Sequence, residues 1–350
     1  MKHKIELAKF LDAFILLFCV TLGVSAQEGI RFEHGLSWKE IKEKAKQENK
    51  FIFMDCFTTW CGPCKMMSKD IFPQKEVGDA FNTSFINVKA QMDKSANDNE
   101  EVKKWYDDAE AIAKQYHVMA YPTFLYFSPE GELVHLHVGG ARDPRAFIKT
   151  SLEALDPSTQ YITKMKTAIK EAGNDPGALR RLAVEAKEKY DGVNSQALAN
   201  AYLKLTKNVY TPEHLAFLND FTTSSSGAGF EEFIKHADKI DAVMGKGFSQ
   251  KKVTTVVFME SGVYDAFRSN APVNTGKIEK NIRNIVPAEM AGLLTARANL
   301  LSLQYAKKSD EWLKQIGTFL GKYGKQTYPE EMGGYARFAF SVSEDPAVRE

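Results

Sequence analysis

The stretch FIFMDCFTTWCGPCK, residues 51–65, decides the fold of this chain. Its first half is a nearly continuous apolar run, which is typical of a strand buried on both faces at the centre of an α/β sheet. Its second half opens a helical pattern that continues through Phe72 and ends at Pro73. The stretch therefore predicts a strand over Lys50–Phe57 that leads directly into a helix.

Two cysteines lie at the junction between this strand and this helix. Cys61 is placed at the first helical turn, where unpaired backbone amides and the positive end of the helix dipole stabilise a thiolate. A thiolate is the nucleophile of thiol–disulfide exchange. Cys64 lies within one turn of it, so it can attack a mixed disulfide formed at Cys61. Gly62 and Pro63 suit the turn, because proline is tolerated at a helix start.

Asp55 is an acidic residue inside an apolar run that is predicted to be a buried strand. A carboxylate in a buried strand costs several kcal/mol unless it is paired or protonated. Alone, it would be interpreted as a structural, hydrogen-bonded acid. The cysteine pair that follows it favours a role in acid–base chemistry instead.

The surrounding sequence predicts the rest of an α/β domain. Ser37 and Glu40 form a capping box for a helix that runs to about Glu48. Further strands are expected at Phe85–Val88, Thr123–Phe127 and Leu133–Val138, and further helices at Asp108–Tyr116 and from Pro144 to about Leu155. Strands separated by helices predict parallel pairing, and the last two strands form an antiparallel hairpin.

Residues 53–65 resemble the active-site segment of thioredoxins, residue for residue over Trp60-Cys61-Gly62-Pro63-Cys64-Lys65. The distant segment Val118–Phe124 resembles the cis-proline loop of that family, and Gly139-Gly140 also fits. The resemblance covers about residues 30–155 and implies a thioredoxin fold, a central mixed sheet flanked by helices. Residues 65–72 look closer to exported, disulfide-reducing members than to the cytosolic protein. Lys69 stands where the family has a mid-helix proline.

The resemblance also implies roles for the catalytic residues. Cys61 would attack a substrate disulfide and Cys64 would resolve the intermediate. Asp55 would match the buried carboxylate that exchanges a proton with the resolving thiol, since burial raises its pKa towards a useful range. Lys89 is a candidate partner for Asp55 in this proton relay.

Further residues would contact the substrate. Pro122 would be cis and would pack near the sulfurs, while the backbone of Tyr121 would pair with an extended substrate segment. Trp60 would shield the cysteine pair, and Gly62 and Pro63 would complete the substrate-binding surface. Protein disulfides would be the substrates, and an upstream electron donor would be required, for which a membrane protein is one candidate.

Other polar motifs have plainer interpretations. A lone C-x-x-C could be half of a metal site, but no second cysteine or histidine cluster completes it, so no metal and no cofactor beyond the Cys61–Cys64 disulfide are expected. Cys56 is interpreted as a packed core thiol. His135 and His137 are interpreted as exposed polar residues of an edge strand. Residues 93–104 lack the glycine and glutamate of a calcium loop, and residues 91–107 form a polar insertion.

The N-terminus predicts export. Basic residues precede an apolar run over Ala13–Val24, and Val24-Ser25-Ala26 resembles a cleavage site, so residues 1–26 are interpreted as a signal peptide removed after Ala26. The run is short for an uncleaved membrane anchor. Cys19 lies inside it, which disfavours a lipoprotein site. The expected location is the periplasm or the extracellular medium.

The second half of the chain changes character after Asp156-Pro157, so a thioredoxin-like domain is expected over 27–156 and an all-α domain over 157–350. This domain resembles a helical-repeat solenoid or bundle, although no strict period appears. The expected helices are Ser158–Ala172, Pro176–Tyr190, Ser195–Lys207, Pro212–Phe221, Gly229–Met244, Ser249–Phe267, Thr275–Ile285, Pro287–Lys308, Ser309–Lys322 and Pro329–Val342.

Two functions follow from these patterns. The first is an exported thiol–disulfide oxidoreductase whose helical half docks a client or partner. The alternative is a client-binding, chaperone-like protein with a secondary redox role. A net charge of +1 over 350 residues gives no electrostatic basis for a nucleic-acid partner.

Overall fold

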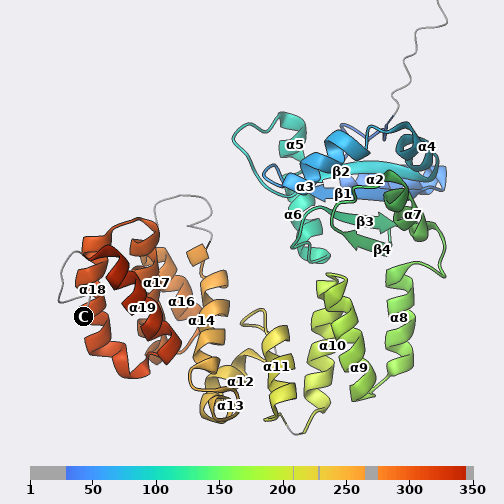
Figure 1. Ribbon diagram of the computed structural model, residues 1–350. Helices are drawn as coiled ribbons and strands as arrows, with labels where there is room; N and C mark the ends of the chain where they lie inside the picture. Colours follow the sequence, from blue (N-terminus) through green and yellow to red (C-terminus); the bar gives the residue numbers. More distant parts are fainter. Residues whose placement is uncertain (1–28, 208, 228, 265–274, 344–350) are drawn as a thin grey trace, which may run out of the picture. The chain divides into compact units, whose positions relative to one another are not determined.

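The structure, a computed structural model, describes residues 29–343 except 208, 228 and 265–274. The signal-peptide prediction therefore lies outside the described residues. The chain divides into two compact units (Figure 1). The first contains the residues up to Glu171 together with Glu185–Val193, and the second contains Ala172–Val184 and the residues from Asn194 onward. The residues just after Asp156 thus pack with the first unit, although the sequence analysis assigned them to the second half.

The first unit is built on a four-stranded mixed sheet in the order β2-β1-β3-β4 (Figure 1). The strands are β1 (Phe51–Phe57), β2 (Phe85–Gln91), β3 (Thr123–Phe127) and β4 (Leu133–Val138). β1 is central and almost wholly buried, as its apolar sequence predicts. The expected thioredoxin fold, with its mixed sheet flanked by helices, is confirmed.

The pairing of β3 differs from the expectation. β1 and β2 are parallel, but β3 runs antiparallel to β1 although helices separate them in sequence. Thr123 pairs with Cys56, so β3 begins at the edge of the sheet where β1 ends. The residues just before β3 are thereby brought to the edge that also carries Cys61.

Helices cover both faces of the sheet. One core cluster unites α2 (Trp38–Glu48) and α6 (Tyr106–Gln115) with side chains of β1 such as Met54. The other unites α4 (Lys75–Ser84) and α7 (Pro144–Leu152) around Phe53 and Phe81. The capping box of Ser37 and Glu40 is present at the start of α2. The sequence pattern does not predict α4, because its buried residues are only Val77, Gly78 and Phe81.

The helix after the cysteine motif is not uniform. α3 (Gly62–Met66) continues directly into η1 (Met67–Ile71), which is π-helical. The amide of Phe72 donates to the carbonyl of Met67 at 2.9 Å, which closes the wider turn. This turn includes Lys69, at the position where the family has a proline. In the polar insertion, a short helix α5 (Glu100–Lys104) precedes α6.

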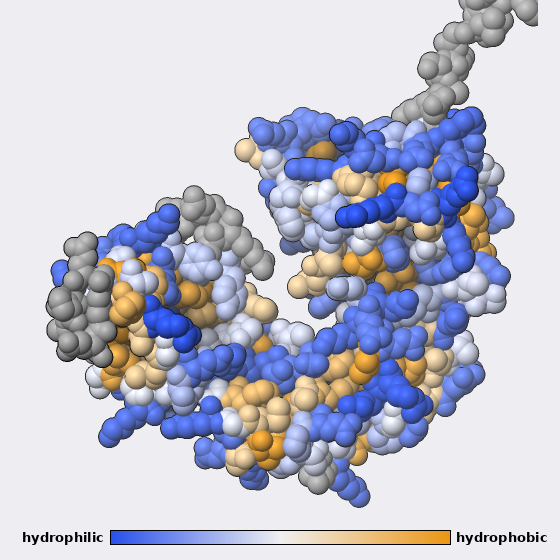
Figure 2. Space-filling model, viewed as in Figure 1, coloured by the Kyte–Doolittle hydropathy of each residue, from blue (hydrophilic) through white to orange (hydrophobic). Residues whose placement is uncertain are grey.

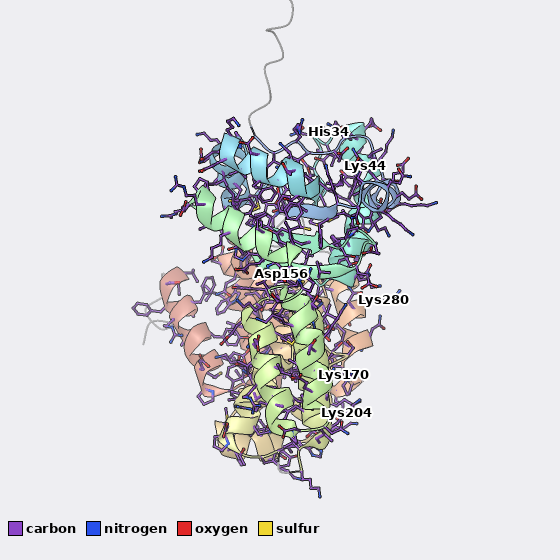
Figure 3. The ribbon with its side chains drawn as sticks, turned by 90° about the vertical axis from the view of Figure 1, so that its right-hand side faces the viewer. His34, Lys44, Asp156, Lys170, Lys204 and Lys280 are labelled. Atoms are coloured by element: carbon purple, nitrogen blue, oxygen red, sulfur yellow. A yellow bond between two sulfur atoms is a disulfide. The ribbon has the colours of Figure 1, made fainter. Side chains whose placement is uncertain are left out.

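The assignment of His135 to an exposed edge is wrong, because α8 (Tyr161–Ala172) covers that part of β4. His135 is only 4% exposed, and its Nδ1 accepts a hydrogen bond from the amide of Tyr161 at 3.0 Å. Burial, together with the charges of His137 and Lys189, lowers the pKa of His135 to about 4. Figure 3 labels Asp156 at the turn that leads into α8 and Lys170 near the far end of this helix.

The second unit is helix-rich, and most of its helices lie where the sequence predicts them. They are α9 (Pro176–Glu188) and α10 (Gly192–Leu205), apart from the end of α9 and the start of α10, which belong to the first unit, and then α11 (Pro212–Phe221), α12 (Phe230–Lys235), α13 (Ala237–Met244), α14 (Phe248–Glu260), α16 (Thr275–Ile285), α17 (Ala288–Tyr305), α18 (Ser309–Tyr323) and α19 (Pro329–Val342). The helix expected over Gly229–Met244 is broken at His236 into α12 and α13. The helical-repeat architecture stays a prediction.

Two clusters of buried apolar side chains stand out among the described residues of this unit. The larger one includes Leu215, Phe233 and Ile282, and the smaller one surrounds Trp312. Figure 2 shows hydrophobic groups interspersed with hydrophilic ones over the visible face of the helical unit. Within the part of the chain that the structure describes, no helix is both long and apolar enough to span a membrane.

Candidate active site

The two cysteines of the motif form a disulfide at the start of α3. The Cys61–Cys64 sulfurs are 2.02 Å apart. Cys61 is the N-cap residue with extended backbone, and its Sγ accepts a hydrogen bond from the amide of Cys64 at 3.1 Å. A sulfur that accepts an orphan helix amide is a place where negative charge is stabilised. Each cysteine is only 3% exposed, so a substrate must approach along a defined direction.

An exposed tryptophan, a half-buried tyrosine and a buried proline lie at the end of the sheet from which the disulfide-bearing helix starts. Trp60 is 69% exposed, and its ring lies 5.9 Å from that of Tyr121 in an edge-to-face arrangement. The Tyr121–Pro122 peptide is cis, as the resemblance implied. The carbonyl of Pro122 accepts a hydrogen bond from the amide of Gly139 at 2.9 Å, which ties this loop to the end of β4. The structure thus brings Trp60, Tyr121 and Pro122 to the edge of the sheet that carries the cysteines.

Asp93 supports the loop that precedes Cys61. The amide of Thr59 donates to its carboxylate at 2.9 Å, and the Thr59 hydroxyl donates to the other oxygen. The sequence patterns did not identify this residue, although its position after β2 could have done so. β1 and β2 are parallel neighbours and end at the same edge of the sheet, so the residues that follow each of them lie close together.

Asp55 and Lys89 meet as expected. They are register partners of the parallel β1–β2 pair, and the Lys89 Nζ lies 3.5 Å from the Asp55 Oδ2. Asp55 is 1% exposed, and neither of its oxygens has a hydrogen-bond partner of normal length among the described residues. Burial raises the pKa of Asp55 to about 6, although the charge of Lys89 opposes the shift. An acid with this pKa can accept and return a proton near neutral pH.

Cys56 has no such environment. Its side chain belongs to the core cluster that α2 and α6 cover, and it is fully buried. Burial first, and then the negative charge of Asp55, raise the pKa of the Cys56 thiol well above its ordinary value. A buried thiol that resists ionisation is inert, which fits the packed core thiol expected from the sequence.

An open groove of about 440 Å³ lies beside Cys64. It is lined by Phe57, Thr58, Thr59, Cys64, Lys65, Ser68 and Lys69. Lys65 and Lys69 place two positive charges at the rim of this groove, beside Cys64. Over the described residues, no group of three or more His, Cys, Asp or Glu side chains is arranged to hold a metal ion.

Comparisons with known proteins agree with this geometry. The thioredoxin-like domain family matches residues 38–154. Thioredoxin-2 of Pyricularia oryzae is 32% identical over 127 residues, which cover 36% of this chain and 61% of that protein, less than two thirds of its length. Thioredoxin H4 of Arabidopsis thaliana is 30% identical over 106 residues, which cover 30% of this chain and 74% of that protein.

A solved structure is also similar to part of the chain. The solution structure of a proposed disulphide-isomerase from Bacteroides thetaiotaomicron is 39% identical, with a TM-score of 0.29, and covers 37% of this chain and 94% of that one. The matched family leaves the helix-rich C-terminal region unassigned. The chain belongs to the thioredoxin-like family, through a disulfide oxidoreductase domain that carries the Cys61–Cys64 pair.

Proposed function

We propose that the protein is an exported thiol–disulfide oxidoreductase that reduces disulfides in protein substrates. The observation that carries the proposal is the position of Cys61 as the N-cap of α3, with Cys64 in the same turn. The helix start stabilises the Cys61 thiolate, and the second sulfur is within bonding distance of the first.

The reaction starts from the reduced pair. The Cys61 thiolate attacks one sulfur of a substrate disulfide, the substrate S–S bond breaks, and one substrate sulfur leaves as a thiolate that takes a proton from water. Cys64 then gives its proton to the Asp55 carboxylate and attacks Cys61 Sγ. This step breaks the bond between Cys61 and the substrate, forms the Cys61–Cys64 disulfide and releases the second substrate sulfur as a thiolate, which takes a proton from water while Asp55 returns its proton to the solvent. A dithiol donor must return two electrons and two protons to restore the enzyme.

Asp55 and Lys89 serve the second half of this reaction. The Asp55 carboxyl is buried and has a pKa of about 6, so it is ionised enough at neutral pH to take the proton of Cys64. The Lys89 ammonium at 3.5 Å stabilises the ionised form. Both residues lie at the end of the strand pair that leads to the disulfide.

Trp60, Tyr121 and Pro122 form the substrate-binding surface together with Gly62 and Pro63. The exposed Trp60 ring supplies apolar contact area beside nearly buried sulfurs. An extended substrate segment would lie along the backbone of Tyr121. The same surface would receive the upstream electron donor, which must reach the same disulfide.

Reduction is favoured over oxidation because Cys-Gly-Pro-Cys is the sequence of reducing thioredoxins, near about −270 mV. Export rests on the N-terminal residues 1–26. The location would be the periplasm or the extracellular medium, where a reductase depends on a donor that delivers electrons across or from the membrane. The donor is expected to be a dithiol protein.

The helix-rich unit is proposed to dock a client or partner and so to give the redox centre its selectivity. Large apolar side chains are exposed on several of its helices, including Val243 at 38%, Met259 at 56% and Phe340 at 57%. The same exposure supports the alternative function, a chaperone-like protein in which client binding is the main activity and redox chemistry is secondary.

Insulin reduction by the full mature chain separates the two functions. The wild type is expected to reduce insulin with dithiothreitol as donor, and Cys61→Ser is expected to be inactive. Equal and negligible turnover by both proteins would favour the binding protein, and suppression of aggregation by both would then support it. Cys64→Ser should accumulate mixed disulfides, whose partners identify the substrate class.

A further inference from the structure

Ser68 occupies an unusual position in the π-helical turn that follows the cysteine motif. It lies in η1, one turn after Cys64, and it lines the same open groove as Cys64. π-helical turns widen a helix locally and are frequent at functional sites. The reaction described above does not use this side chain, although its hydroxyl contacts Lys89, the ion-pair partner of Asp55.

The Lys89 ammonium is shared between two acceptors. It donates a hydrogen bond to the Ser68 Oγ at 2.7 Å, whereas its distance to the Asp55 Oδ2 is 3.5 Å. A direct ammonium–carboxylate hydrogen bond would measure about 2.7–2.9 Å. The neutral hydroxyl, and not the carboxylate, therefore has the short contact.

Three aromatic rings lie around this ammonium. Nζ lies 4.7 Å from the ring centre of Phe57 and 5.4 Å from those of Phe32 and Phe72. Rings at this distance attract a cation and also limit the entry of water. These rings and Ser68 thus hold the ammonium beside Asp55 without a direct hydrogen bond to it.

We infer that Ser68 is a positioning residue that holds the Lys89 ammonium back from Asp55 and so keeps the Asp55 carboxyl a stronger base for Cys64. This inference deepens the proposed function and rests on it. It assigns to the hydroxyl a role that acts through Lys89, without contact to the reacting sulfurs.

The other groups around Asp55 do not supply this effect. Cys56, its neighbour on β1, is a buried thiol, and Tyr126 on β3 is a buried phenol that donates to or accepts from Ser151. Cys64 belongs to α3, and Lys65 and Lys69 line the groove at the exposed side. Lys89 is the cation that forms an ion pair with Asp55 in the described part of the chain.

The expected change can be estimated from Coulomb's law. If the hydroxyl is removed, the ammonium can close from 3.5 Å to about 2.8 Å from the carboxylate. At an effective dielectric constant of about 20, this closure lowers the titration midpoint of Asp55 by about one pH unit. Because Ser68 is exposed, its replacement by alanine leaves the core intact.

The test is a titration of the Asp55 carboxyl carbon by NMR in the oxidised, full mature chain, with Asp55→Asn to assign the signal. Ser68→Ala is expected to lower the midpoint by about one unit, and Ser68→Thr is expected to keep it. Lys89→Met is expected to raise it. In the Lys89→Met background, Ser68→Ala should have no effect, since the hydroxyl acts through the ammonium.

An unchanged or raised midpoint in Ser68→Ala would overturn the inference, and so would an equal lowering in the Lys89→Met background. The titration uses the oxidised protein and needs no turnover. A protein that fails to reduce insulin but shows the expected shifts would refute the proposed function alone. A protein that reduces insulin without those shifts would refute the role of Ser68 alone.

Discussion

Asp55 on β1 and Lys89 on β2 face one another across the parallel strand pair, with 3.5 Å between the carboxylate and the ammonium. The ammonium also donates to Ser68 of η1, the turn that follows the disulfide-bearing α3. Because the ion pair is longer than a hydrogen bond, burial prevails over the attraction of Lys89 and raises the pKa of Asp55. The carboxyl is therefore a proton acceptor whose strength depends on small displacements of one lysine.

The first prediction concerns the resolving step. In the wild type, the rate at which Cys64 resolves a Cys61 mixed disulfide should rise with pH around 6, as Asp55 ionises. Asp55→Asn should remove this rise and slow resolution on the order of 100-fold near neutral pH, since it removes a general base. Stopped-flow release of the second thiol from a peptide mixed disulfide measures the rate. Superimposable pH–rate profiles would exclude Asp55 from the mechanism.

The second prediction concerns the loop before Cys61. Asp93→Ala removes both hydrogen bonds to Thr59, so the loop that carries Trp60 should lose its fixed orientation. We expect kcat/KM for insulin reduction to fall about tenfold, which corresponds to about 1.4 kcal/mol, with little change in the free energy of unfolding. Asp107→Ala, which removes an equal charge from the exposed start of α6, is the control. A similar loss in both variants would indicate a charge effect instead.

The third prediction concerns a buried ion pair in the helix-rich unit. The guanidinium of Arg297 is 3% exposed and donates to Glu331 from its Nε at 2.6 Å, while Tyr335 also donates to Glu331. Glu331→Gln should lower the free energy of unfolding by about 3–5 kcal/mol, because it leaves a buried charge uncompensated. The double variant Arg297→Met/Glu331→Leu should recover most of that loss. Urea unfolding followed by fluorescence measures both.

The neighbouring pair Lys251–Glu330 provides the control for that experiment. Both side chains are more than half exposed, and their closest contact is 2.8 Å. Glu330→Gln should therefore change the free energy of unfolding by less than about 1 kcal/mol. Equal effects of Glu330→Gln and Glu331→Gln would show that burial does not set the strength of the Arg297 pair.

Sequence patterns predicted those parts of the site that depend on position along the chain. The helix start fixes Cys61 and Cys64, and the parallel strand pair brings Asp55 beside Lys89. The patterns could not predict contacts that depend on side-chain direction, such as that of Ser68, which follows from the π-helical turn. They also gave β3 the wrong direction, because helices between two strands do not fix the edge at which the second strand begins.

The burial of His135 was unpredictable for a related reason. Its strand pattern is that of an exposed edge, and only the packing of α8, which begins more than twenty residues later, covers it. Tertiary contacts between distant segments decide such cases. The consequence is a further buried titratable group in the first unit, with a pKa shifted in the direction opposite to that of Asp55.

The fourth prediction follows from these opposite shifts. The pKa of Asp55 is raised from 3.8 to about 6, so its contribution to stability is fully present below pH 3.8 and is lost as the pH rises through 6. The pKa of His135 is lowered from 6.5 to about 4, so its contribution is present above pH 6.5 and is lost as the pH falls through 4. Each shift corresponds to about 3 kcal/mol. The two contributions therefore oppose one another between about pH 4 and 6.5.

The free energy of unfolding of the wild type should consequently vary little across this window, whereas each single variant should show a slope. In Asp55→Asn it should fall on acidification, because the contribution of His135 is then no longer opposed by that of Asp55. In His135→Asn, whose side-chain oxygen can accept the Tyr161 amide in place of Nδ1, it should rise. Urea unfolding of the oxidised chain at pH 4.5, 5.5 and 7 measures the slopes, and the profile of Asp55→Asn/His135→Asn should follow that of the wild type. On unfolding, a buried acid releases protons, whereas a buried neutral imidazole takes them up, so the two groups give slopes of opposite sign. Slopes of the same sign in the two single variants would therefore contradict the assignment of Asp55 and His135 to these two states.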